Sequence, residues 1–119
     1  MILAELNALL LALGVRVETG TFSGKAPEEY CVITPLTDQF IYADDEPTHD
    51  INEARISLFS KKNYLARKIQ IEQALLAADF TITDRYFIGY EEDTGYNHVA
   101  VDAAKSYLLE ETEQWQQSD

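Results

Sequence analysis

The chain has 119 residues, of which 46% are hydrophobic, a length and composition that suit one domain with a modest core. Its formal net charge is -12, because 21 acidic residues face only nine Lys and Arg. Such a chain is repelled by nucleic-acid phosphates and by anionic membrane surfaces. The balance therefore argues against a general DNA-binding protein.

Cysteine content and the N-terminal segment bear on the cellular setting. Cys31 is the one cysteine and lies in the apolar run YCVI, so it has no partner for an internal disulfide and belongs to no CxxC motif. We expect a buried, reduced thiol. The opening stretch MILAELNALLLALG is apolar, but it lacks a basic leading region, carries Glu5 and is shorter than the roughly 20 residues of a spanning helix. We expect no secretion or membrane insertion and an intracellular setting.

The first third of the chain predicts a helix and two strands. Apolar residues over 2–13 recur on one helical face, and Gly14 supplies a stop signal. These residues are Ile2, Leu3, Leu6, Leu9, Leu10 and Leu13. VRVET at 15–19 and YCVIT at 30–34 predict strands, joined by a flexible arm that contains two glycines and a proline.

The segment from 39 to 60 predicts a short strand, an acidic loop and another strand. QFIYA at 39–43 has strand composition, whereas ADDEPTHDINE at 43–53 brings five acids and no base and predicts an exposed loop. ARISLFS at 54–60 alternates in the manner of a half-buried strand.

The second half predicts a helix and a long hairpin. The helix begins near Tyr64, with Ser60 or Asn63 as the candidate cap. Two adjoining apolar rows are expected to face the core: Leu65, Ile69 and Leu76, and Tyr64, Ile71 and Leu75. FTITDRYFIGY at 80–90 and the strand-like run that begins at Tyr96 are linked by EEDTG and predict the hairpin. One face of its first strand is expected to carry Phe80, Ile82, Tyr86, Ile88 and Tyr90.

Together these elements predict one α+β domain over residues 1–109 and a polar C-terminal tail over 110–119. The sheet is expected to be largely antiparallel or mixed, with the helices packed on one face and a long C-terminal β-hairpin. The tail EETEQWQQSD is too polar to pack alone, so we expect it to fray unless a neighbouring subunit holds Trp115.

Positive charge is concentrated in one segment. Residues 54–79 carry five bases and two acids, unlike the rest of the chain. The bases are Arg55, Lys61, Lys62, Arg67 and Lys68. They form either a solvated face or a basic patch that meets the acidic loop of another copy, since complementary patches steer heterologous contacts.

Common catalytic patterns are missing from the sequence. The chain has no GxGxxG, phosphate-binding loop, HExxH, GxSxG or paired CxxC motif. A carboxylate metal site at Asp44, Asp45, Glu46 and Asp50 is a weaker hypothesis, because adjacent acids in a loop are usually solvated. His98 is expected to lie mid-strand as a packing or interface residue. We therefore predict no enzyme, no catalytic or metal-binding residues and no cofactor.

The stretch YEEDTGYNH at 90–98 places three acids and a glycine between Tyr90 and Tyr96, and His98 follows two residues later. A hairpin connection explains it better than a reactive site, because Gly95 can adopt the positive φ of a tight link. The hairpin aromatics Tyr86, Tyr90 and Tyr96 are expected to pack across strands and to leave aromatic surface for a partner.

Residues 56–111 resemble small tail proteins of long-tailed phages and prophages of Gram-positive bacteria, in the tail terminator or head-tail joining (minor tail) group. The resemblance rests on SLFSKKNY, the helix that follows it, TDRYF and YEEDTGYNH, in this order. The first half matches only in the placement of a helix and strands.

The resemblance implies a structural virion protein that assembles into a homo-oligomeric ring, typically a hexamer, at the head-proximal end of the tail tube. The ring stops tube polymerisation and joins the tail to a head connector or stopper protein, and DNA passes through its lumen without specific binding. The implied partners are therefore the tail tube protein and the connector. The subunit is assembled in the host cytoplasm and is then located in the virion, with no membrane partner.

Acidic side chains in the lumen would repel DNA and let it slide. We expect the lumen or acidic contact surface among Asp44, Asp45, Glu46 and Asp50, with Glu91, Glu92 and Asp93 as competitors. The alternative function is that of an acidic DNA mimic that inhibits a host nucleic-acid enzyme, which requires carboxylates spaced along a continuous surface.

Overall fold

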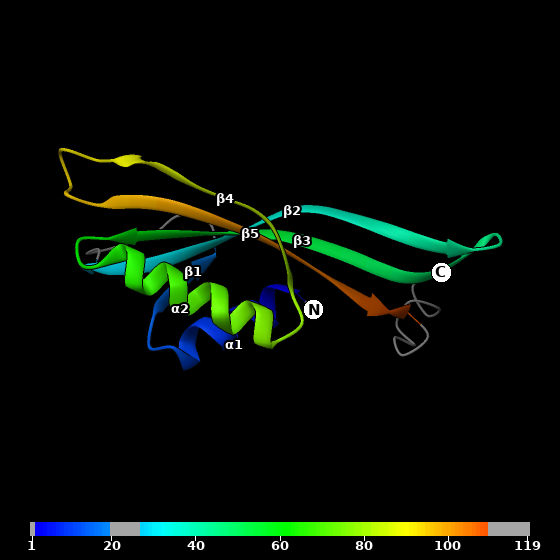
Figure 1. Ribbon diagram of the computed structural model, residues 1–119. Coiled ribbons are helices and arrows are strands. Elements are labelled where there is room, and N and C mark those ends of the chain that lie inside the picture. Colours follow the sequence, from blue (N-terminus) through cyan, green and yellow to red (C-terminus); the bar gives the residue numbers. More distant parts are fainter. Residues whose placement is uncertain (1, 20–26, 110–119) are drawn as a thin grey trace.

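The protein folds into a five-stranded mixed sheet with two helices, as seen in a computed structural model that describes residues 2–19 and 27–109 (Figure 1). The elements in chain order are α1 (Ile2–Ala12), β1 (Arg16–Thr19), β2 (Glu29–Ala43), β3 (Glu46–Ser60), α2 (Tyr64–Ala77), β4 (Thr81–Tyr90) and β5 (Asn97–Leu108). The strand order is β1-β2-β3-β5-β4, in which β1 pairs with β2 in parallel and all other neighbours are antiparallel. The predicted α+β class is confirmed.

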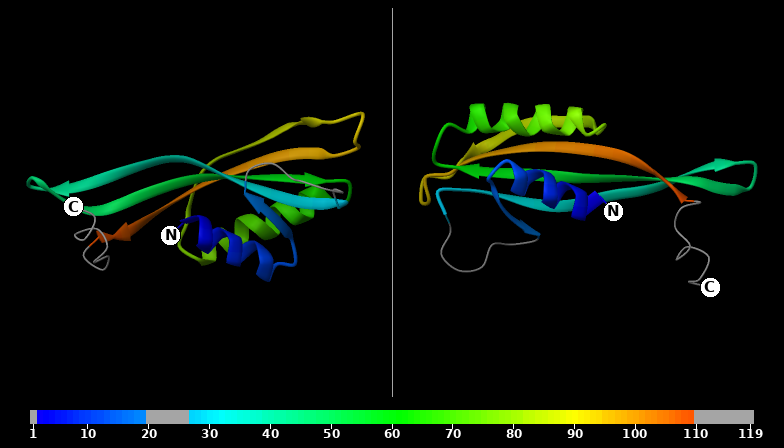
Figure 2. Two further views of the ribbon diagram at one scale, coloured as in Figure 1. Left: turned by 180° about the vertical axis from the view of Figure 1, so that it is seen from behind. Right: turned by 90° about the horizontal axis from the view of Figure 1, so that it is seen from below.

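Both helices lie on the same face of the sheet, here called the helix face; the other is the open face (Figures 1 and 2). Register places alternate residues of the central strands toward the helices, so that Ile56 lies beside Ile33 on β2 and Val101 on β5. These side chains are buried together with Leu6 of α1 and Leu75 of α2. The core therefore sits between the helix pair and the proximal half of the sheet, the half that contains the C-terminal end of β3.

The first helix forms where its apolar spacing predicts it. Ile2, Leu6 and Leu10 are buried, and Leu3, Leu9 and Leu13 pack against them in part. Gly14 has φ +81°, a left-handed conformation that favours glycine, and it ends the helix as expected.

The second helix starts with a side-chain cap. The Asn63 side chain accepts a hydrogen bond from Ala66 N at 3.1 Å, which satisfies one of the free N–H groups of the first turn. Ser60, the other candidate cap, instead donates to Glu29 Oε2 at 3.0 Å.

One of the two apolar rows predicted for this helix is wrong. Ile71 and Leu75 are buried, but Leu65, Ile69 and Leu76 are 56%, 51% and 58% exposed. Only one face of α2 can contact the sheet, and Tyr64, Ile71 and Leu75 occupy it. The row of Leu65, Ile69 and Leu76 is left on the solvent side.

The predicted acidic loop at 43–53 is also wrong, whereas the strand predicted at 39–43 is confirmed as the end of a longer strand. Residues 29–43 form one strand, β2, and residues 46–60 form another, β3; the connection is Asp44 and Asp45 alone. Strand pairing explains the extent of β3: residues 49–60 have ladder partners on both sides, in β2 and in β5. A register shift between Pro35 and Thr37 accommodates the proline, which cannot donate to a ladder.

The distal part of β2 and β3 extends as an arm beyond the helices (Figures 1 and 2). The principal extents are 52 × 27 × 23 Å, and the radius of gyration is 16.1 Å. A compact chain of this length would have a radius of about 13.5 Å. The molecule is thus elongated along its strands, with the β2–β3 turn at one end.

The β4 and β5 strands are antiparallel neighbours joined by residues 91–96, at the end of the molecule opposite to the β2–β3 turn. The expected polar tail at 110–119, with Trp115, lies outside the described residues, as does most of the arm predicted between β1 and β2. Neither α1 nor α2, the helices in the described part of the chain, has the length and apolar character needed to cross a bilayer.

Candidate functional site

The five bases of the predicted basic patch do not form one free positive surface. Three of them pair with carboxylates of the same chain: Arg55 with Asp102 at 2.8 Å, Arg67 with Glu29 at 2.9 Å and Lys68 with Glu72 at 2.8 Å. Arg55 also lies on the open face, whereas Arg67 and Lys68 belong to α2 on the helix face. The patch is therefore divided between two faces and is largely neutralised.

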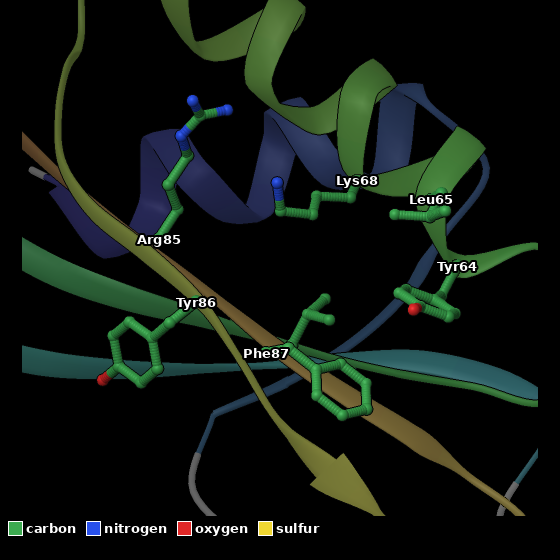
Figure 3. A pocket seen from close by; sticks show the side chains of 7 residues that line it. Tyr64, Leu65, Lys68, Arg85, Tyr86 and Phe87 are labelled. Atoms are coloured by element: carbon green, nitrogen blue, oxygen red, sulfur yellow. The ribbon is translucent and has the colours of Figure 1, made fainter.

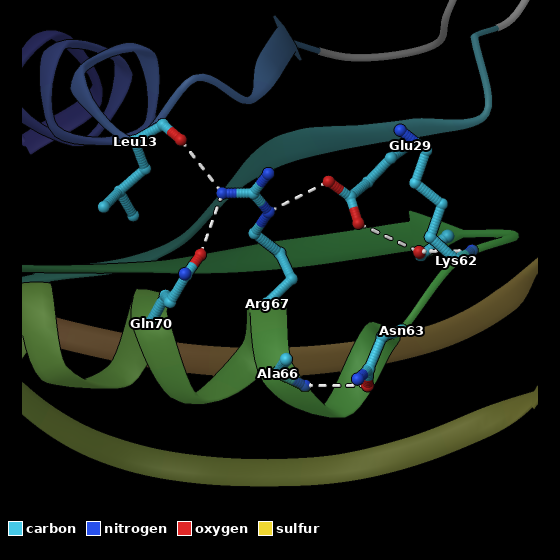
Figure 4. Close-up of polar contacts among 8 residues, drawn as sticks. Leu13, Glu29, Lys62, Asn63, Ala66, Arg67 and Gln70 are labelled. Carbon is cyan, nitrogen blue, oxygen red and sulfur yellow. Dashed lines mark hydrogen bonds and ion pairs between the residues drawn. The ribbon is translucent and has the colours of Figure 1, made fainter.

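Arg67 joins three elements on the helix face (Figure 4). Its Nε donates to Glu29 on β2, and its Nη1 donates to the Leu13 carbonyl oxygen after α1 and to Gln70 Oε1, both at 2.9 Å. Glu29 also accepts from Ser60 at the end of β3. The arrangement explains Arg67 as a structural link between α1, α2 and the sheet.

Lys61 and Lys62 are the exposed members of the predicted patch. Both follow the last residue of β3, and the Lys61 Nζ lies 4.9 Å from the centre of the Tyr96 ring. Among the five bases of the predicted patch, the two without an ion pair within the described residues therefore lie at the proximal end of the sheet.

The predicted acidic residues form two groups at opposite ends of the long axis. Asp44, Asp45 and Glu46 are exposed at the β2–β3 turn, where Asp44 has φ +57°. Asp50, assigned to the same group by its place in the sequence, is half-buried within β3.

Glu91, Glu92 and Asp93 occupy the β4–β5 link at the other end. The main chain closes this link, because Gly95 N donates to the Glu91 carbonyl oxygen at 2.7 Å and Glu91 N donates to the Tyr96 carbonyl oxygen at 2.8 Å. Gly95 has φ +85°, the positive value expected for a tight connection. The two acidic groups are thus separate and do not make a continuous carboxylate row.

His98 packs against a neighbouring ring, as predicted, but it is the second residue of β5 and does not lie mid-strand. Its ring stacks on Phe59 with 4.0 Å between ring centres, and Phe59 stacks in turn on Tyr30 at 4.9 Å. Burial lowers the pKa of His98, against the charge of Glu91, which raises it. Its buried Nε2 has no hydrogen-bond partner among the described residues, so the neutral ring suits this position better than the charged one.

The hairpin aromatics have different environments. Tyr96 is buried, and its hydroxyl donates to the Pro27 carbonyl oxygen. Tyr86 lies on the open face with the Arg55 guanidinium 5.3 Å above its ring centre, and Tyr90 is exposed. Of these three tyrosines, Tyr86 and Tyr90 leave aromatic surface for a partner and Tyr96 does not.

Two features with binding potential were not predicted from the sequence. The first is a groove of about 390 Å³ between α2 and β4, lined in part by Leu65, Lys68, Arg85 and Phe87 (Figure 3). The second is the exposed apolar run Phe40, Ile41 and Tyr42 beside the acidic turn. The run could have been noticed, because successive strand residues face opposite sides and at least one of three must point away from any single core.

The described residues contain no group of three or more His, Cys, Asp or Glu side chains arranged to hold a metal ion. Cys31 is buried, and burial raises the pKa of its thiol to about 12. A thiol of this kind is mainly protonated at neutral pH and is a poor nucleophile. What the surface does offer is exposed apolar area flanked by charge, which suits protein contacts.

No family model matches this chain, and a search of curated proteins gave no match either.

Proposed function

We propose that the protein is a structural subunit of a phage tail that assembles into a ring at the head-proximal end of the tail tube. In this role it ends tube polymerisation and joins the tail to the head connector or stopper, while DNA passes through the ring. The proposal combines the resemblance of residues 56–111 with the distribution of exposed apolar surface.

The exposed apolar surface is the observation that carries the proposal. Thirteen large apolar side chains are exposed among the described residues, and they include whole groups on the distal arm, on α2 and on β4. Isolated exposed apolar side chains are ordinary, but groups of them mark contact surfaces. An elongated subunit with such groups at separate places can contact a different neighbour at each, as a ring requires.

Exposed strand edges give further support. The β4 strand is an outer strand of the sheet and carries Tyr86, Phe87, Ile88 and Tyr90. Two register shifts interrupt its pairing with β5 but leave these side chains exposed. Proteins usually protect such edges, because they pair readily with other chains. In an assembled ring the neighbouring subunits would cover this edge.

The charge distribution agrees with a DNA-conducting ring. A chain of net charge -12 does not retain a phosphate backbone, so DNA can slide past it. The two acidic groups lie at opposite ends of the molecule. This does not favour the DNA-mimic alternative, which needs carboxylates along a continuous surface.

The decisive experiment locates the protein in virions and determines the mass of its assembly. Light scattering and electron microscopy of the purified protein, with antibody labelling of intact phage particles, should reveal a ring with a central pore at the head-tail junction. Absence of the protein from virions would refute the proposal. A monomer in solution would not, because the tube end can be needed for assembly.

A further inference from the structure

The groove between α2 and β4 has an apolar floor and a positive rim (Figure 3). Leu65 of α2 and Phe87 of β4 line it and are 56% and 52% exposed, so both would gain from being covered. The Phe87 ring also contacts Tyr64, with 5.8 Å between ring centres. These contacts hold the apolar floor in place before any partner binds.

The rim of the groove carries excess positive charge. Lys68 and Arg85 reach the same carboxylate, Glu72, at 2.8 and 3.4 Å. Two cations face one anion there, although the chain as a whole is strongly acidic. Asp84, the neighbour of Arg85, pairs in register with Asp102 on the open face and so does not neutralise the rim. The groove is therefore suited to an apolar side chain accompanied by carboxylates.

The tip of the β2–β3 hairpin, residues 40–46, has this composition. Phe40, Ile41 and Tyr42 are 40%, 43% and 60% exposed, and Asp44, Asp45 and Glu46 follow directly. Within the described residues no ion pair reaches these three carboxylates. The tip thus presents unneutralised acids next to an uncovered tyrosine.

The tip cannot reach the groove of its own chain. It lies at the far end of two paired 15-residue strands, whereas the groove is formed by the start of α2 and the middle of β4 (Figure 1). Paired strands of this length do not fold back without loss of their ladder. Any contact between the two surfaces must join different copies.

We propose that the hairpin tip of one copy docks into the α2–β4 groove of the next copy, head to tail. Tyr42 covers Leu65 and Phe87, and the carboxylates of the turn face Lys68 and Arg85. The inference rests on the proposed ring function and deepens it, because a heterologous contact repeated around an axis closes into a ring.

Cysteine cross-linking tests the contact directly. One preparation carries Ala43→Cys on the tip, the other Ile69→Cys one turn after Leu65 on α2, so that the contact residues themselves are kept. The two are mixed at millimolar concentration with a short bismaleimide. Buried Cys31 does not compete, since its thiol is inaccessible. The matched control replaces the groove cysteine by Ala77→Cys, at the other end of the same helix. Docking should raise the yield of cross-linked dimer on the order of tenfold over this control, because it holds the two thiols at high effective concentration.

A pair of assembly variants provides the second measurement. Tyr42→Ser/Asp45→Asn removes an apolar side chain and a charge from the tip, and Leu65→Ser/Phe87→Ser removes the apolar floor of the groove. Circular dichroism and urea unfolding establish that each variant folds. Neither variant alone should associate. Their mixture should give dimers of one copy of each and nothing larger, because a single intact tip and a single intact groove remain in each pair.

The outcomes separate this inference from the proposed function. Equal cross-linking in the test and control mixtures, or no dimers from the mixed variants, would overturn the docking. If virions contain the ring but the cysteine pairs do not cross-link, the docking proposal would be overturned. The proposed tail function would still be supported. A specific cross-link in a protein that virions lack would support the docking and remove the tail function.

Discussion

Arg55 on β3 donates two parallel hydrogen bonds to Asp102 on β5, from Nε to Oδ1 at 2.8 Å and from Nη2 to Oδ2 at 3.1 Å. Hydrogen bonding to Asp102 raises the pKa of the guanidinium. The Asp102 side chain is 6% exposed and faces Asp84 of β4 in register. Arg55 therefore screens a nearly buried carboxylate from a second one.

Removal of the Arg55 charge should destabilise the fold. In Arg55→Met, Asp102 is left without its partner and beside Asp84, so we expect a loss of about 2 kcal/mol in the free energy of unfolding. This is below the cost of breaking a fully buried pair, because the Arg55 side chain is 34% exposed. Urea unfolding at neutral pH measures the change.

The double variant Arg55→Met/Asp102→Asn distinguishes charge from packing. If the buried carboxylate is the cause, its removal should recover more than half of the lost stability. A double variant as unstable as Arg55→Met would instead assign the loss to the contact of the Arg55 guanidinium with the Tyr86 ring.

Glu5 ties α1 to β5 through two contacts. Lys105 Nζ donates to Oε2 at 2.5 Å and Tyr107 Oη donates to Oε1 at 2.9 Å. Burial disfavours the ionised form of Glu5, but these hydrogen bonds and the Lys105 charge outweigh it and lower the pKa of Glu5. The same contact and burial raise the pKa of Tyr107.

A lowered Glu5 pKa contributes stability above the unfolded value, near 4.5, and this contribution is lost as the pH falls through the folded value. We therefore expect Glu5→Gln to reduce stability at pH 7 but to change it much less at pH 3. Thermal unfolding at both pH values measures the difference. Exposed Asp79→Asn is the control, and a pH-independent loss in Glu5→Gln would contradict an ionic contribution.

The spacing of apolar residues and the helix-end residues identified the helices and most of the core from the sequence. They did not reveal which residues from different elements would contact each other. Gly14 and Asn63 mark helix ends through their own backbone and side-chain chemistry, so their roles are visible in sequence. The choice between the two apolar rows of α2 depends on which face meets the sheet. Glu72 shows part of this limit: its partner Lys68 is visible from helical spacing, but its burial and its second partner, Arg85 on β4, depend on how the helix packs on the sheet.

The distal arm was predicted only in part, as a strand at 39–43, for a related reason. Residues 36–51 have no helix above them, so they lack the alternation of buried and exposed residues that reveals a strand in sequence. Their strand structure comes from pairing between β2 and β3, and with β5 for residues 49–51. The candidate site was missed in part too, because Arg55 and Arg67 are bound by carboxylates that only the fold brings near. The pair of Lys68 and Glu72, four residues apart on α2, is visible in the sequence.

His98 should make stability sensitive to mild acid. Burial lowers its folded pKa below the ordinary value of 6.5, so the neutral ring stabilises the fold above that pH. As the pH falls below 6.5 the unfolded chain binds a proton first, and stability declines. We expect His98→Phe, which keeps the stack on Phe59, to remove much of the decline between pH 7 and 5. In the control variant His49→Gln, the decline in stability between pH 7 and 5 should persist. If the decline disappeared in His49→Gln, it would be caused by His49 and not by His98.

Leu75 and Leu76 are sequence neighbours on α2 with opposite environments, fully buried and 58% exposed. Leu75→Ala should cost about 2–5 kcal/mol of unfolding free energy, since it opens a cavity in the core. Leu76→Ala should change it by no more than about 0.5 kcal/mol, because the side chain already contacts water in the isolated subunit. Urea unfolding of both variants measures the two changes under the same conditions. Equal losses of unfolding free energy in the two variants would mean that another copy covers the row of Leu65, Ile69 and Leu76 in solution. Dilution should then abolish the difference in stability between Leu76→Ala and the unaltered protein.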